Sequence, residues 1–261
     1  MIIKKIDNYI TAVNAKSGYF PPFRLNICLY IVDGVLIDAG SSNILKKIKP
    51  LLQNEKIDSA AITHIHEDHT GLAPWIKNNL KIPVYLPANS IDEAAKKSIL
   101  PLYRILTWGN RDAFIADPMP PFIETKKFKL DVIESPGHHK DHVVFYEKNN
   151  GWLFSGDMYI GRKQLVAFKD ENIGDAIRSL SKLIQLDIDK IFCGHSGIHS
   201  NGKEKMKSKL DFFLDIQHRV NALKKEGLTL EEIDKRLFPK ANLWTIASRG
   251  EWSTSNIVKT I

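Results

Sequence analysis

Residues 63–69 read Thr63-His-Ile-His-Glu-Asp-His69, and four of these side chains are potential metal ligands: His64, His66, Asp68 and His69. Imidazole nitrogens and carboxylate oxygens at this density favour Zn²⁺, with iron or manganese as alternatives. On an extended loop His64, His66 and Asp68 would point the same way. His69 would turn to the other side and serve a second ion. A surface loop that is histidine-rich by chance is the competing interpretation, and a total of nine histidines in the chain disfavours it.

Further ligand candidates follow the strands predicted on either side of this motif. Residues 60–63 form a buried strand that leads directly into His64. His138, Asp157 and His195 follow predicted strands at 129–134, 152–154 and 190–193, and each has a glycine immediately before it. Glycine lets the backbone turn sharply at a strand end. We therefore expect these side chains to converge at one edge of a sheet.

The rest of the chain predicts an α/β protein, organised as a single domain over residues 1–261. Residues 203–261 are expected to be a helical C-terminal part, with a capping box at Thr229-Leu-Glu-Glu232. The proline-rich stretch 117–121 is expected to be a loop. We expect no membrane-spanning segment, because no apolar run approaches the ~20 residues that a bilayer requires. Residues 1–6 lack the apolar region of a signal peptide, so a cytoplasmic location is expected.

The charge and the cysteines add little to this interpretation. The formal net charge is +7, and we interpret the scattered lysines, including 203, 205, 207 and 209, as solvated helix faces. Binding of nucleic acid is therefore the weaker alternative to a small-molecule substrate. Cys28 and Cys193 are expected to be reduced, buried thiols. The oligomeric state is not determined by the sequence.

Five elements now stand in a fixed order between residues 26 and 195: Asp38 in Ile37-Asp-Ala-Gly40, the 64–69 run, His138, Asp157 in Ser155-Gly-Asp157, and His195 in Gly194-His195. In this order they resemble the metallo-β-lactamase superfamily. The resemblance implies an αββα sandwich with C-terminal helices and two metal ions at one edge.

The resemblance also implies a role for each residue of the motif. The first metal would take His64, His66 and His138, and the second would take Asp68, His69 and His195. Asp157 would bridge the two ions, and Asp38 would support the ligands from behind. True β-lactamases of this fold commonly place a cysteine where Asp157 stands, so antibiotic hydrolysis is not the expected activity. The ligand set looks closest to glyoxalase II-like thioesterases, lactonases and tRNA 3′-processing enzymes.

The expected activity is that of a di-zinc hydrolase, in which a metal-bridging hydroxide cleaves a small-molecule ester, thioester or lactone. Two ions that share a hydroxide would lower the pKa of water toward ~7. Asp68 would hold the hydroxide and shuttle its proton. Tyr159 would donate a hydrogen bond to the developing oxyanion, or would be an ordinary core or pocket-wall tyrosine. A phosphodiesterase or ribonuclease of the same fold, and a non-hydrolytic redox protein, are the alternatives.

The sequence gives less definite predictions for one long segment, four cationic side chains and two further histidines. The segment 89–125 would form a lid or pocket wall through side chains such as Tyr103 and Trp108, or would pack against the sandwich. Four cationic side chains could meet an anionic group: Arg104, Arg111, Arg162 and Lys163. His139 is expected to face away from the metals, and His142 to pack behind a ligand.

Overall fold

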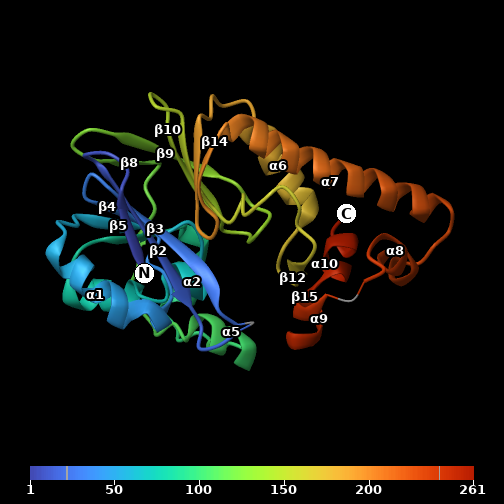
Figure 1. The fold of residues 1–261 in the computed structure, drawn as a ribbon, viewed down its shortest axis with the longest axis horizontal. Helices are drawn as coiled ribbons and strands as arrows, with labels where there is room; N and C mark the ends of the chain where they lie inside the picture. Colours follow the sequence, from blue (N-terminus) through green and yellow to red (C-terminus); the bar gives the residue numbers. More distant parts are fainter. Residues whose placement is uncertain (22, 241) are drawn as a thin grey trace.

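The computed structural model describes residues 1–21, 23–240 and 242–261. Two β-sheets face each other in the middle of the molecule, and helices cover the outer side of each (Figure 1). The predicted αββα sandwich is therefore confirmed. Among the described residues, no helix has both the length and the apolar character that crossing a bilayer requires.

The first sheet comes from the N-terminal half of the chain. Within the described residues it has seven strands in sequence order: β1 (Ile2–Lys5), β2 (Ile10–Ser17), β3 (Leu25–Val32), β4 (Val35–Ile37), β5 (Ser59–Ala61), β6 (Val84–Leu86) and β7 (Asp117–Pro118). Strands β1 to β4 pair antiparallel, and β4 to β7 pair parallel. The expectation of a loop throughout 117–121 is wrong at its start, because β7 pairs with β6 and the Asp117 carboxylate accepts a hydrogen bond from the Val84 amide.

The second sheet comes from the following part of the chain. Its six described strands lie in the order β14-β13-β11-β10-β9-β8: β14 (Gly197–Ser200), β13 (Lys190–Cys193), β11 (Trp152–Gly156), β10 (Val143–Glu147), β9 (Lys129–Glu134) and β8 (Phe122–Glu124). A separate two-residue pairing joins β12 (Ala167–Phe168) to β15 (Trp252–Ser253). This pairing holds the C-terminal segment beside the edge of the sandwich where strands β5, β11 and β13 end.

The helices divide between the two outer faces. The first face carries η1 (Ser42–Ile44), α1 (Leu45–Asn54), α2 (Glu67–Thr70), α3 (Ala73–Asn79), η2 (Ala88–Ser90), α4 (Ile91–Ala94) and α5 (Leu102–Trp108). The second carries α6 (Ile173–Leu183), α7 (Gly202–Lys225), α8 (Leu230–Leu237) and α10 (Thr254–Lys259), and α9 (Leu243–Ala247) lies beside β15. Figure 1 shows α1 and α2 on one side of the sheets and α6 and α7 on the other.

The alternation of side chains along the strands explains this layering. In β3, Tyr30 and Val32 face the second sheet, whereas Leu29 and Ile31 face the helices of the first side. Successive side chains of a strand point to opposite faces, so one apolar strand serves two cores at once. In α8 the predicted capping box is present. The C-terminal part 203–261 also contains the short strand β15, which the helical pattern did not predict.

Candidate metal centre

The seven predicted ligands meet at the edge of the sandwich where strands β5, β11 and β13 end. They form two adjacent groups in which ligand atoms lie within 4.8 Å of one another: His64, His66 and His138, and Asp68, His69, Asp157 and His195. All but His195 are buried, and the side chain of His195 is 14% exposed. Residues far apart in the sequence are thus brought into one compact set.

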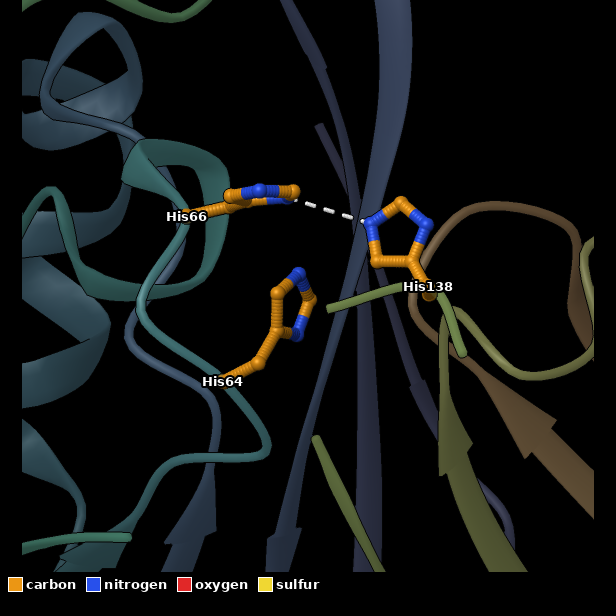
Figure 2. A group of neighbouring side chains, drawn as sticks. All are labelled: His64, His66 and His138. Carbon is orange, nitrogen blue, oxygen red and sulfur yellow. Dashed lines mark hydrogen bonds between the residues drawn. The ribbon is translucent and has the colours of Figure 1, made fainter. Parts of the chain in front are cut away.

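In the first group three imidazole rings face a common space. Figure 2 shows His64 and His66 on one loop and His138 opposite them on a separate segment. His66 Nδ1 lies 3.1 Å from His138 Nε2. His64 Nε2 is buried and has no hydrogen-bond partner among the described residues. A buried polar atom without a partner is costly, and a bound cation would remove that cost.

In the second group the carboxylate of Asp157 lies between histidines of both groups. Its Oδ1 lies 3.3 Å from His69 Nε2, and its Oδ2 lies 3.1 Å from His195 Nε2 and 3.5 Å from His138 Nε2. Asp68 Oδ2 lies 3.2 Å from His195 Nε2. The Asp157 carboxylate therefore contacts histidines of both groups.

Each of the five histidines has its other ring nitrogen bound by an acceptor outside the cluster. The acceptors are Thr63 Oγ1 for His64 Nδ1 (3.0 Å), Asp170 Oδ2 for His66 Nε2 (3.3 Å), Asp38 Oδ2 for His69 Nδ1 (2.8 Å), Glu171 Oε2 for His138 Nδ1 (3.5 Å) and the Asn26 carbonyl for His195 Nδ1 (2.6 Å). Such partners fix the tautomer and the ring orientation of metal-binding histidines. Five ring nitrogens are thereby directed into the same space, so the donor set fits metal binding.

Asp38 supports the cluster from the end of β4, as the resemblance implied. It accepts hydrogen bonds from the Thr63 amide (2.8 Å) and the Thr63 hydroxyl (3.0 Å) through Oδ1, while Oδ2 receives His69. Its backbone has a φ of 60°, a left-handed conformation that aspartate tolerates better than most residues. One carboxylate thus positions both the first and the last histidine of the 64–69 run.

Glycine is required where two strands end at the cluster. A Cβ added to Gly194 would lie 2.8 Å from His69 Cε1 and 3.0 Å from Asp157 Oδ1. A Cβ added to Gly156 would lie 2.7 Å from His142 Nε2, and Gly156 has a φ of 47°. These glycines therefore let the backbone approach the rings closely and turn within one residue.

The cluster holds its charges in a definite pattern. Burial lowers the pKa of His64 well below its ordinary value, and the charges of His69 and His66 lower it further. Burial disfavours ionisation of Asp68, but the adjacent His69 and His195 outweigh burial and hold the pKa of that carboxyl well below its usual range. His64 is consequently neutral and Asp68 ionised at neutral pH, which is the state that a metal ligand requires.

Protons will compete with metal at His69 and His195. Burial opposes protonation of His69 and His195, but Asp38 and Asp157 raise the pKa of His69, and Asp157 raises that of His195, well above the ordinary value. In the metal-free protein both rings therefore hold a proton near neutral pH, and binding must displace it. We expect zinc affinity to rise as the pH is raised through neutrality, with protons released on binding. Calorimetric zinc titration in buffers of different ionisation enthalpy checks this, and a pH-independent affinity would contradict it.

A cavity of about 410 Å³ opens onto the cluster. His66, Asp68, His138, Asp157 and His195 line it from one side. Its other walls are largely apolar and include Leu25, Trp108, Ile160, Leu165, Val166, Phe168 and Trp252. The Trp108 ring stacks on His195 at 6.0 Å between centroids, and Phe168 stacks on Trp252 at 4.9 Å. Trp108 at the end of α5 is the part of segment 89–125 that contributes to this wall.

Several weaker expectations fail in the structure. His139 does not face away: its ring lies 5.1 Å from that of His66, and its Nδ1 is paired with Asp141. The Arg104 guanidinium is buried and makes two hydrogen bonds of 2.7 Å with the Glu67 carboxylate. Arg111 donates to main-chain carbonyls, among them that of Ala94. The two arginines are therefore engaged within the protein and are not directed at a ligand.

Two other expectations concern residues behind the cluster. His142 packs there as expected: its Nε2 accepts a hydrogen bond from the Asp157 amide, and burial lowers its pKa to about 3. Tyr159 lies in the apolar cluster of the second face, with its ring 5.4 Å from that of His199. The catalytic role of Tyr159 remains a prediction that these contacts do not support.

Sequence reasoning missed three charged residues beside the cluster. Asp170 contacts His66, and Glu171 contacts His138, on the side away from the cluster. In the sequence these two residues are only an acidic pair before a helix, a pattern that does not indicate this role. Lys209 lines the cavity and is only 3% exposed, so its interpretation as part of a solvated helix face is wrong. A signal did exist, because position 209 shares the helical spacing of the apolar residues Met206 and Phe213.

Comparison with known proteins agrees with this geometry. Residues 28–195 match the family model described as the metallo-β-lactamase superfamily. The chain is 25% identical over 247 residues to the β-lactamase-like protein 2 homolog of Caenorhabditis elegans, covering 89% of this chain and 77% of that protein. It is 28% identical over 171 residues to the hydroxyacylglutathione hydrolase of Bdellovibrio bacteriovorus, covering 64% of this chain and 60% of that protein's length.

Solved structures show the same fold. A metallo-β-lactamase family protein from Thermus thermophilus superposes with a TM-score of 0.66 at 19% identity, over 95% of this chain and 90% of that chain. The fold, the order of the motif residues and the family match therefore agree with one another.

Proposed function

Because the chain belongs to the metallo-β-lactamase superfamily, we propose that it is a metal-dependent hydrolase that cleaves a small-molecule thioester, ester or lactone. The ligands that we assign to two zinc ions are His64, His66 and His138 for one ion and Asp68, His69 and His195 for the other, with Asp157 shared. Nitrogen and carboxylate donors of this kind suit zinc, with iron or manganese as alternatives.

The observation that carries this proposal is the orientation of the five histidines. Each has one ring nitrogen held by an acceptor outside the cluster and the other directed inward. A merely structural cluster of histidines would not need every ring held in this way. Partners of this kind orient ligands around a metal.

Different residues of the chain would have different roles in hydrolysis. When bound, two ions supply Lewis-acid polarisation of a carbonyl and a water whose pKa is lowered toward ~7. Asp157, which lies between His69, His138 and His195, would hold the two sites at a fixed separation. Asp68 is ionised and lines the cavity, so its carboxylate can accept the proton of the attacking water and pass it on. The walls formed by Trp108, Phe168 and Trp252 would exclude bulk water from the reacting bond.

The cavity favours a leaving group that needs little protonation. Its described lining includes no uncommitted carboxylic acid that would act as a strong general acid, because Glu171 accepts hydrogen bonds from Gln164 and from the Phe168 amide. A thiolate or enolate leaves without such help, whereas an amine requires it. This supports thioester substrates in particular, in keeping with the name of the Bdellovibrio relative.

The test is metal analysis combined with a substrate panel. We expect the purified protein to contain zinc and to hydrolyse at least one acyl thioester or lactone. That activity should disappear after chelation and return when zinc is added. Cleavage of RNA or a phosphodiester without any acyl hydrolysis would instead establish the phosphodiesterase alternative, for which the net charge of +7 is the supporting observation. Bound iron with no hydrolysis of any substrate would indicate a redox protein.

A further inference from the structure

Lys209 is a buried cation beside the metal centre that has no partner among the residues that the structure describes. It lies on α7 and is 3% exposed, yet it lines the same cavity as Asp68, Asp157 and His195. Its ammonium forms no ion pair or hydrogen bond with any described residue. The nearest aromatic contact is Phe213, whose ring centroid lies 5.4 Å from Nζ. A buried charge is costly unless it is paired, so a negative group bound next to Lys209 would stabilise its charged form.

The acidic residues nearby do not provide that partner. Glu171 is the negative group that most favours ionisation of Lys209, and it only partly offsets the lowering of the Lys209 pKa by burial. Both of its carboxylate oxygens are already used, Oε1 by the Phe168 amide at 2.9 Å and Oε2 by Gln164 at 2.6 Å. Asp157, the next carboxylate, is committed to the histidines of the cluster. A negatively charged partner for the Lys209 ammonium can therefore come from a ligand bound in the cavity.

We propose that Lys209 binds a carboxylate of the substrate and thereby selects acyl substrates that carry a negative group away from the scissile bond. This inference rests on the proposed hydrolytic function and adds the substrate's chemical class to it. A bound carboxylate would keep the lysine charged and would satisfy an ammonium that the fold leaves unpaired.

A single carboxylate suits this cavity better than a nucleic acid backbone. The described wall residues supply two cations, Lys163 and Lys209, of which Lys163 is exposed. They also supply Asp68, Asp157 and Glu171. Proteins that bind phosphate backbones neutralise several phosphates with several lysines or arginines. One buried ammonium among apolar walls matches a small anion attached to an apolar body.

The test compares matched thioesters with and without a carboxylate. The carboxylate can lie on the acyl side, as in S-succinyl against S-butyryl N-acetylcysteamine, or on the thiol side, as in S-butyryl 3-mercaptopropionate against its methyl ester. Wild-type protein should have a higher kcat/KM for the charged member of at least one pair. In Lys209→Met that preference should fall about 10- to 100-fold, mainly through KM, as expected for loss of a hydrogen bond to a charged group. Lys209→Arg should retain part of the preference.

Lys207→Met is the matched control, because Lys207 lies on the same helix with its side chain 66% exposed and is paired with Asp211. It should keep the full preference. A wild-type protein that hydrolyses thioesters without preferring either charged member would overturn the inference. An unchanged preference in folded Lys209→Met would do the same. Thermal melting establishes folding, and if the methionine variant does not fold, Lys209→Gln takes its place.

Binding without turnover separates this inference from the proposed function. The probes are 3-(butylthio)propanoate and its amide, titrated calorimetrically into wild-type and Lys209→Met protein. Tighter binding of the acid than of the amide, lost in the variant, supports the role of Lys209 even where no thioester is hydrolysed. Equal binding of acid and amide to the wild-type protein contradicts it, whatever the enzyme assays show.

Discussion

Replacing Asp157 with alanine should abolish hydrolysis and reduce the metal content of the protein. The Asp157 carboxylate lies 3.3 Å from His69 Nε2, 3.1 Å from His195 Nε2 and 3.5 Å from His138 Nε2, so its carboxylate contacts histidines of both ligand groups. Metal catalysis contributes several kcal/mol of transition-state stabilisation, and ~1.4 kcal/mol corresponds to a tenfold change in rate. Loss of the bridge should therefore lower kcat by at least about 10³-fold.

The measurement pairs turnover with metal per chain, determined by mass spectrometry of the purified variant. Asp157→Asn keeps the shape of the side chain and removes its charge, so it distinguishes loss of a ligand from disruption of packing. Asp211→Ala, at an exposed position of α7, is the control and should retain wild-type activity and metal. An Asp157→Ala protein with full activity and full metal content would refute the dinuclear mechanism.

Removing the Arg104 side chain should destabilise the fold more than most single substitutions. Arg104 on α5 makes two hydrogen bonds of 2.7 Å with Glu67, and their side chains are 9% and 2% exposed. Breaking such a buried pair from one side leaves an uncompensated charge and costs about 3–5 kcal/mol. That is a large fraction of the roughly 5–15 kcal/mol that stabilises a typical domain. Arg104→Met should therefore lower the free energy of unfolding by about 3–5 kcal/mol.

Urea denaturation of the zinc-saturated protein measures this effect. The double variant Arg104→Met/Glu67→Gln removes both charges, so it should be less destabilised than the sum of the two single variants. Lys97→Met breaks an exposed pair with Asp112 elsewhere in segment 89–125 and should leave the unfolding midpoint unchanged. Equal effects of Arg104→Met and Lys97→Met would show that the buried pair has no special role.

The same pair connects stability to the metal centre. Glu67 lies between His66 and Asp68 in the sequence, and Arg104 also lies 3.6 Å from Glu251 of the C-terminal segment. The guanidinium stands over the Phe168 ring at 4.9 Å, and Phe168 lines the cavity. The loop that bears the ligands, the α5 segment and the C-terminal segment are thus joined through one buried cation. A loss of zinc affinity should accompany the loss of stability in Arg104→Met.

The sequence by itself determined the elements whose signal is local. The run from His64 to His69 is dense enough to indicate a metal site without any neighbour. The strands at Lys129–Glu134 and Lys190–Cys193 were predicted with the bounds that the structure gives. The glycines before His138, Asp157 and His195 marked the points where the backbone turns. Propensity, alternation and glycine geometry act within a few residues, so they can be inferred from the chain alone.

Only the tertiary structure decided what each side chain faces. Strand β2 (Ile10–Ser17) was not predicted, because its half-buried pattern is defined by pairing with β3 on one side and β1 on the other. The sequence pattern placed Lys209 in a solvated run of lysines and Arg104 on a surface that could meet a ligand. Packing instead puts the first in the cavity and the second against Glu67. Burial and the identity of a charge's partner depend on segments distant in the sequence, and no local pattern along the chain contains that information.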